Sequence, residues 1–364
     1  MTSDWMSALK SVPIDWLLEA DNQPVRFFTM RDLLEYKSND SELIEARQNL
    51  GRYRVTQNIL SKQKPEGFWE SKDEPYLPKY KSSFWQVMLL GMFGMDRSNP
   101  QIGEAVGHLL DFQHEDGGFV EFMERGAKKE YELVRKRNLA RRKVTPSFEE
   151  WAPAKIRESE LSCLTGNVAL ALIRLGYSEH RAIDDALAWL VEIQNIDGGW
   201  LCPYWGAHKN DKHGCFMGTI TPLDAFSETP KKHRSIGIRR AIKRGVEFIL
   251  MHRLYKSDHH DFRIINKQWL MLTFPQFFYD IVRGLAVVTK LGFEKDSRID
   301  DALDVIMNKQ LASGEWVLER TLSGRLYGSI EHKGKPSKWI TLEILRIIKQ
   351  VVQSRGHFEL QILD

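Results

Sequence analysis

The hydrophobic positions of the chain alternate between two kinds of predicted helix. Helices that are apolar nearly all round and rich in small residues are expected at 83–94, 161–175, 216–226, 275–291 and 339–352. Amphipathic helices, apolar at i, i+3 and i+4 intervals, are expected at 102–112, 182–193, 236–251 and 299–309. An all-apolar helix is usually buried, whereas an amphipathic one faces solvent on one side. The pattern therefore predicts an inner ring of helices surrounded by an outer ring.

The first sixty residues predict two short helices, at 13–18 and 24–34, and a longer polar one at 41–60. The segment 13–18 is expected to be the outer partner of the last inner helix and so to close the ring. The prediction is a single all-α domain over residues 1–364, with about six inner and six outer helices.

A short motif recurs where these helices end. Its clearest copy is Gln194-Asn-Ile-Asp-Gly-Gly-Trp200, and related copies begin at Gln63, Gln113 and Gln310. Glycine supplies the positive φ that a helix end or tight turn needs. We expect the aromatic residue to fold back over the preceding helix and the glutamine side chain to bond to the turn backbone.

The spacing of the copies gives a repeat of about 50 residues. The interval from Gln113 to Gln194 is longer because it contains a polar, basic insertion at about 120–158. The interval from Gln194 to Gln310 is twice 58, and a degenerate copy around His252 lies at its midpoint.

Paired helices with Q-x-x-x-G-x-[WF] turns resemble the α/α toroid of squalene and oxidosqualene cyclases and of protein prenyltransferase β subunits. The resemblance implies an enzyme acting on an isoprenoid substrate. Neither the acidic D-x-D-D motif of the squalene cyclases nor a magnesium-binding D-D-x-x-D motif occurs in the sequence. The pairs Asp184-Asp185 and Asp300-Asp301 are interpreted as first-turn acids favoured by the helix dipole.

The prenyltransferases hold zinc with an Asp-x-Cys pair at the start of one inner helix and a His on the next. In this sequence His213-Gly-Cys215 stands at such a start, so Cys215 matches the Cys and His213 replaces the Asp. On the next inner helix Asp280 lies near the position of the His. This exchange of ligand types departs from the family pattern.

The cysteines suggest a metal site without reference to any family. Cys163 and Cys215 begin consecutive inner helices and Cys202 lies between them. Neighbouring helices pack closely enough for such side chains to converge, and His208 or His213 could complete a tetrahedral Zn²⁺ site. The predicted ligands are Cys163, Cys202, His213 and Cys215. The alternative is that the cysteines are small core residues.

Further candidates lie near the starts of inner helices. Asp280 and Arg283, one turn apart, are the predicted catalytic pair, with a simple salt bridge as the alternative. Lys338 could hold an anion at a helix N-terminus. Aromatic residues could line a chamber for an apolar substrate or serve only as core packing. These substrate-binding candidates are Trp85, Trp269, Phe277, Phe278, Tyr279 and Trp339.

Composition narrows the possible partners. The net charge of +3 is too small to indicate nucleic acid. Nothing in the sequence indicates a nucleotide cofactor, and three cysteines make no disulfide framework. With no long apolar run, we expect a cytoplasmic protein. Residues 125–143 hold nine Lys and Arg against two Glu, so the insertion could contact a membrane surface or an acidic protein, or be a plain surface excursion.

The leading functional hypothesis is a prenyltransferase-like or terpenoid-cyclase-like enzyme with an apolar substrate and Zn²⁺ as a possible cofactor. Two alternatives stay open. One is a non-catalytic toroid that binds an apolar ligand or a protein. The other is a carbohydrate- or peptide-modifying α/α barrel, which predicts a polar cavity.

Overall fold

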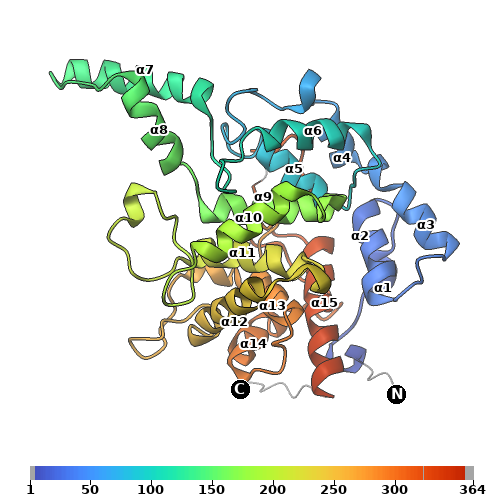
Figure 1. Cartoon of the computed structure of the whole chain (residues 1–364). Helices are drawn as coiled ribbons and strands as arrows, with labels where there is room; N and C mark the ends of the chain where they lie inside the picture. Colours follow the sequence, from blue (N-terminus) through green and yellow to red (C-terminus); the bar gives the residue numbers. More distant parts are fainter. Residues whose placement is uncertain (1–4, 323, 357–364) are drawn as a thin grey trace. The chain divides into compact units, whose positions relative to one another are not determined.

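The chain is all-α, as predicted, with helices paired in the manner of the α/α-toroid class. The computed structural model describes residues 5–322 and 324–356, and there the chain forms fifteen α-helices and no strand beyond isolated β-bridges (Figure 1). Two compact units are formed, one by residues 59–241 and the other by residues 1–58 with 242–364. None of the described helices is both long and apolar enough to cross a bilayer.

The unit of residues 59–241 contains three apolar helices that pack side by side. They are α5 (Ser83–Met92), α9 (Ser162–Leu172) and α11 (Phe216–Glu228). Two amphipathic helices, α6 (Pro100–Leu110) and α10 (Arg181–Glu192), pack against α5 and α9. The basic insertion forms α7 (Glu124–Ala140) and α8 (Phe148–Glu158). These pairs follow the predicted order of apolar and amphipathic segments.

The second unit repeats the arrangement. Its apolar helices α13 (Ile281–Lys290) and α15 (Lys338–Arg355) pack together, and α15 also contacts α2 (Gln23–Phe28) and its π-helical continuation Thr29–Leu33. Helix α14 (Asp300–Met307) covers α13, and α1 (Ile14–Leu17) contacts α15, which confirms the predicted partner of the last inner helix. The unit also holds α3 (Ser41–Gln48). Along the chain, the boundaries between the two units fall at 58/59 and 241/242. These positions lie within α4 (Arg54–Leu60) and α12 (Ile236–Met251).

Two predicted helix boundaries are wrong. The helix expected at 275–291 begins only at Ile281, because Asp280 is extended and caps it by accepting a hydrogen bond from the Arg283 N–H at 2.8 Å. The helix expected at 41–60 is divided into α3, a 3₁₀ turn (Leu50–Arg52) and α4. Gly51 in this turn has a low helix propensity, which favours a break in the helix at this point.

The predicted geometry of the recurring turns is confirmed by hydrogen bonds. The indole N–H groups of Trp69, Trp200 and Trp316 each donate to the carbonyl ten residues earlier, at 2.6–2.8 Å. Three of the glutamines donate both to the glycine carbonyl four residues on and to a carbonyl on another helix or on the N-terminal segment. These glutamines are Gln113, Gln194 and Gln310.

A further bond in each turn was not predicted. The backbone N–H of the aromatic residue donates to a hydroxyl in the first turn of the next apolar helix, at 2.8–3.1 Å. The accepting residues are Ser83, Thr165, Thr219 and Thr341. Each turn therefore ties together the helix before it and the helix after it.

Gly117→Ala should destabilise the protein by more than about 1 kcal/mol. Gly117 has φ +106°, and an added Cβ would lie 2.3 Å from the Asp185 carbonyl oxygen. The matched control is Gly107→Ala on the exposed face of α6, where nothing lies within 4 Å of the new Cβ. The control should be neutral or stabilising by about 0.5–1 kcal/mol. Urea unfolding followed by circular dichroism measures both, and equal effects would contradict the close approach.

Candidate functional site

Three segments of the 59–241 unit bring cysteine and histidine side chains together at the start of α9. Cys202, on the loop after Trp200, has its sulfur 3.6 Å from the Ser162 hydroxyl oxygen. It also shares hydrogen bonds with the Cys163 thiol and the His208 imidazole. The Cys202 backbone N–H donates to His208 Nδ1 at 3.1 Å, which fixes the ring beside the thiols. Cys215 lies next to this loop because its N–H donates to the Trp200 carbonyl at 2.8 Å.

The surroundings of Cys202 favour its thiolate. Hydrogen bonds from the Cys163 thiol, the His208 ring, the Ser162 hydroxyl and the Cys163 backbone N–H lower the pKa of Cys202, although burial opposes them. The same hydrogen bond and burial raise the pKa of Cys163, and burial raises the pKa of Cys215. The hydrogen bond to Cys202 raises the pKa of His208. A thiolate at the start of a helix and beside an imidazole is typical of functional cysteines.

Three of the four predicted metal ligands thus lie in one cluster, which we call the thiol cluster: Cys163, Cys202, Cys215 and His208. His213 is half exposed, with its ring 3.9 Å from the Asp197 carboxylate and 3.2 Å from the Gly214 carbonyl. His208, the other histidine weighed from the sequence, occupies the position beside Cys202. All three cysteines are free, and only Cys202 is buried.

The close approach of α9 and α11 holds the thiol cluster together. A Cβ on Gly166 would lie 2.5 Å from the Thr221 backbone, and one on Gly218 would lie 2.6 Å from the Trp200 carbonyl oxygen. The shared Cys-x-x-Gly pattern at 163–166 and 215–218 therefore has a physical reason: each glycine allows the backbone contact beside its cysteine.

Three aromatic side chains, Tyr76, Tyr80 and Trp85, pack together in the same unit as the thiol cluster. The Trp85 ring contacts Tyr76 and Tyr80, with centroids at 5.3 and 4.9 Å. Burial raises the pKa of Tyr76, and the nearby charges of Glu121, Cys163 and Cys202 raise it further. Trp85, a predicted substrate-binding residue, thus contacts a tyrosine whose hydroxyl lies within the electrostatic influence of Cys163 and Cys202.

Glu121 belongs to the same region and was not predicted. Burial raises the pKa of its carboxyl to about 7, with Glu130 and Cys202 adding to the shift and Lys79 and Lys155 opposing it. The sequence held one signal for this residue. Glu121 and Cys202 each follow the aromatic residue of a recurring turn by two positions, so equivalent turns place both beside the cluster.

A second polar cluster in this unit surrounds an arginine. Ligand atoms of His114, Asp116 and Glu160 lie within 4.8 Å of one another. The Arg157 guanidinium is 2.5 Å from Asp116, 3.2 Å from Glu160 and 2.9 Å from His114 Nδ1. Burial and a hydrogen bond with Asp116 raise the pKa of Glu160 to about 8. The guanidinium already supplies the positive charge, so we assign this cluster a structural role.

The predicted catalytic pair lies in the other unit and is buried. Asp280 is 2% exposed and Arg283 is 1% exposed. Burial raises the pKa of Asp280 to about 7, although hydrogen bonds from the Arg283 and Thr273 backbones and the Arg283 charge oppose the shift. Asp280 therefore acts as the cap of α13 and is also a carboxyl that can hold a proton near neutral pH.

The other predicted substrate-binding residues also lie in this unit. Trp269 and Tyr279 form an edge contact at 5.1 Å, and Trp339 stacks on Phe274 at 4.7 Å. Phe277 is fully buried, and Phe278 is half-buried. These contacts place the rings ahead of α13 and at the start of α15, and a substrate-binding role for them stays a prediction.

Lys338 is placed differently from the expectation of an anion-binding lysine. It is 6% exposed, and its ammonium pairs with Glu19 at 2.7 Å and with Asp21, over the Trp16 ring. Two carboxylates thus already balance its charge, and these pairs fasten α15 to the N-terminal segment.

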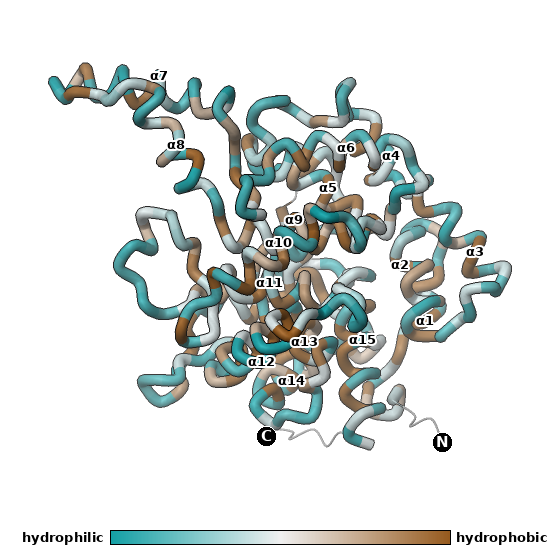
Figure 2. Tube along the Cα trace, viewed as in Figure 1, coloured by the Kyte–Doolittle hydropathy of each residue, from teal (hydrophilic) through white to brown (hydrophobic). Residues whose placement is uncertain are grey.

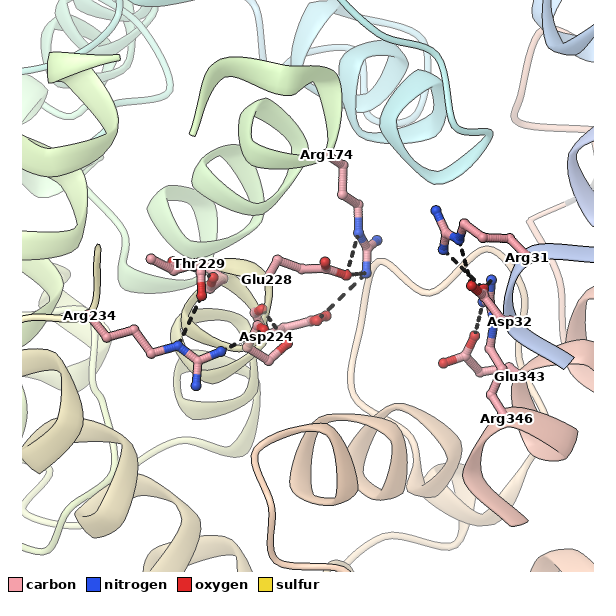
Figure 3. Close-up of polar contacts among 11 residues, drawn as sticks. Arg31, Asp32, Arg174, Asp224, Glu228, Thr229, Arg234, Glu343 and Arg346 are labelled. Atoms are coloured by element: carbon pink, nitrogen blue, oxygen red, sulfur yellow. Dashed lines mark hydrogen bonds and ion pairs between the residues drawn. The ribbon is translucent and has the colours of Figure 1, made fainter. Parts of the chain in front are cut away.

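In two further ion networks, one in each unit, the charges are likewise balanced by side chains of opposite charge (Figure 3). In the 59–241 unit Arg174 binds Glu228 at 3.1 Å and lies 3.7 Å from Asp224. In the other unit Asp32 pairs with Arg31 and Arg346, whose charges lower its pKa against the effect of burial. Because each carboxylate faces a guanidinium, we interpret both as bridges between neighbouring segments.

Known proteins are similar to this chain in structure and not in sequence. No protein-family model matches the chain, and no curated protein matches its sequence. Type II terpene cyclase MstE from Scytonema, in complex with merosterolic acid A, is similar at 15% identity and TM-score 0.44, covering 92% of this chain and 87% of that chain. The same cyclase in complex with geranylgeranyl dihydroxybenzoate is similar at 15% sequence identity and TM-score 0.45, and the match covers 92% of this chain and 88% of that chain. A protein from Actinoplanes is similar at 16% sequence identity and TM-score 0.44, and the match covers 93% of this chain and 97% of that chain. This likeness concerns the fold alone.

Proposed function

We propose that the protein is an enzyme acting on an apolar, isoprenoid-type substrate, with the thiol cluster as its reactive centre and Zn²⁺ as the metal held there. The observation that carries the proposal is the meeting of Cys163, Cys202, Cys215 and His208 from three separate segments. Sulfur and imidazole ligands in this number are the set that Zn²⁺ prefers.

The side chains fit zinc in the chemistry of their donor atoms. No three of these four donor atoms lie within 4.8 Å of one another. Binding a metal therefore requires an inward movement of the Cys202–His208 segment, which is a loop with one short 3₁₀ turn (Gly206–His208). When bound, the metal would supply a Lewis acid that lowers the pKa of a bound water or thiol.

The surroundings of the thiol cluster favour an apolar substrate. Tyr76, Tyr80 and Trp85 present rings on one side, and ring faces stabilise both hydrocarbon chains and developing positive charge. The Glu121 carboxyl is the acid–base group of this region. Asp280 and Arg283, in the other unit, are a second candidate pair for proton transfer.

Protein purified without added metal should contain about one zinc per chain, and Cys202→Ser and Cys215→Ser should lose nearly all of it. Each substitution replaces a soft thiolate ligand by a hydroxyl while it keeps the size of the side chain. Elemental analysis by mass spectrometry measures the metal, and circular dichroism confirms that the variants fold.

The two histidines provide a matched control. His208→Ala should lose zinc, whereas His213→Ala should retain it, because His208 is the histidine that hydrogen-bonds to Cys202. Folded wild-type protein that lacks zinc would overturn the metal centre. Lipid extraction of the same sample followed by mass spectrometry tests the substrate class: a bound isoprenoid supports the proposal, and a bound sugar or peptide contradicts it.

A further inference from the structure

The basic insertion is an arm with a fixed base. Helices α7 and α8 form a hairpin that extends away from the other helices of the 59–241 unit (Figure 1). At the base, Gly126 lies against the Asp73 carbonyl and Lys129 pairs with Glu74 at 2.7 Å. Further along, the Tyr131 ring contacts two rings of α8, and its hydroxyl donates to the Pro146 carbonyl at 2.7 Å. The hairpin is therefore packed internally.

The far end of the arm combines exposed apolar and basic side chains. Leu133, Leu139 and Val144 are 61%, 77% and 92% exposed. Between Leu133 and Val144 the sequence has six basic residues and no acid. These are Arg135, Lys136, Arg137, Arg141, Arg142 and Lys143. Figure 2 shows hydrophobic and hydrophilic positions interleaved along α7. We call residues 133–144 the arm tip.

We propose that the arm tip docks on an anionic lipid surface. Cations near such a surface are attracted by its negative potential, and branched apolar side chains bury themselves among the headgroups. A nucleic acid would satisfy the cations but would leave Leu139 and Val144 in water, because a phosphate backbone offers them no apolar contact. The pairing of both kinds of side chain on one tip favours lipid.

The other end of the arm contacts the loop that carries two residues of the thiol cluster. Arg157, in the last turn of α8, donates to the Tyr204 hydroxyl at 2.6 Å and covers its ring at 4.1 Å. The Gly206 N–H donates to Glu158 at 3.3 Å. Tyr204 and Gly206 belong to the loop that carries Cys202 and His208. If the proposed function is correct, docking brings this loop to the source of an apolar substrate; the docking itself does not depend on that function.

The test is flotation of the full chain with phosphatidylcholine vesicles that contain or lack 30% phosphatidylserine. The wild type should float with the anionic vesicles only, and less as salt is raised. Arg141→Glu with Arg142→Glu, and separately Leu139→Asp with Val144→Asp, should each weaken binding at least tenfold. Arg240→Glu with Lys243→Glu, both exposed on α12, makes the same change in charge outside the arm and should alter binding less than twofold.

Three outcomes would overturn lipid docking. One is wild-type protein that does not float with anionic vesicles, and another is a loss in the α12 variant as large as that in the tip variants. The third is binding that needs the tip cations but not Leu139 and Val144, which would indicate a polyanion such as nucleic acid. Zinc content should be unchanged in the tip variants. Flotation therefore tests docking, and elemental analysis tests the proposed metal centre, so that either can fail without the other.

Discussion

Trp200→Ala is expected to destabilise the protein by about 3–5 kcal/mol, because it removes a large buried side chain and leaves a cavity. Trp200 is fully buried, and its indole N–H donates to the Leu190 carbonyl at 2.6 Å. Its backbone carbonyl accepts a hydrogen bond from the Cys215 N–H, so the local rearrangement should also displace the Cys215 thiol. Urea unfolding measures the stability, and elemental analysis tests whether the proposed zinc is lost with it.

Two control variants separate the effect of lost side-chain volume at Trp200 from the effect of the lost indole hydrogen bond. Trp200→Phe keeps most of the apolar contact but leaves the buried Leu190 carbonyl without the indole donor, which costs about 1–3 kcal/mol. Trp205→Ala, three residues after Cys202, removes a ring that is 44% exposed and should cost less than about 1 kcal/mol. An equal loss in Trp200→Ala and Trp205→Ala would contradict the role of the turn.

Asp280→Asn is expected to stabilise the protein at pH 8 by about 2–4 kcal/mol, with no difference below about pH 4. The pKa of Asp280 is raised from 3.8 to about 7 in the folded state, mainly by burial. Between these values the folded protein binds the proton and the unfolded chain does not. Stability of the wild type should therefore fall as the pH rises from about 4 to 7. Asparagine stays neutral and is an equally good helix cap.

The measurement is the free energy of unfolding against pH for both proteins. Asp261→Asn, in an exposed loop, is the control and should leave the profile unchanged. An Asn variant less stable than the wild type at pH 8 would show that Arg283 holds the ionised carboxylate and that burial does not dominate. If Asp280 also transfers a proton in the reaction, the variant should lose activity while it keeps its zinc.

The site could be predicted only in part. The sequence indicated Cys163, Cys202 and Cys215 because two of them begin apolar helices with the same Cys-x-x-Gly pattern. It gave no means of choosing between His208 and His213, since both lie in one polar loop. Glu121 was not predicted because the basic insertion follows it directly. The insertion interrupts the repeat, so the sequence does not readily show that Glu121 and Cys202 occupy equivalent positions after their turns.

The helices and the recurring turns could be predicted from the sequence, because both depend on residues close together in the chain. The 3.6-residue period selects the buried face, and each Trp bonds to a carbonyl only ten residues away. The tertiary structure alone decided that Cys202 meets Cys163 and His208 and that Arg157 reaches Tyr204. It also decided that Lys338 is held by Glu19 and Asp21. These partners come from loops and distant segments, so their meeting depends on how packed helices fix the path of the chain between them.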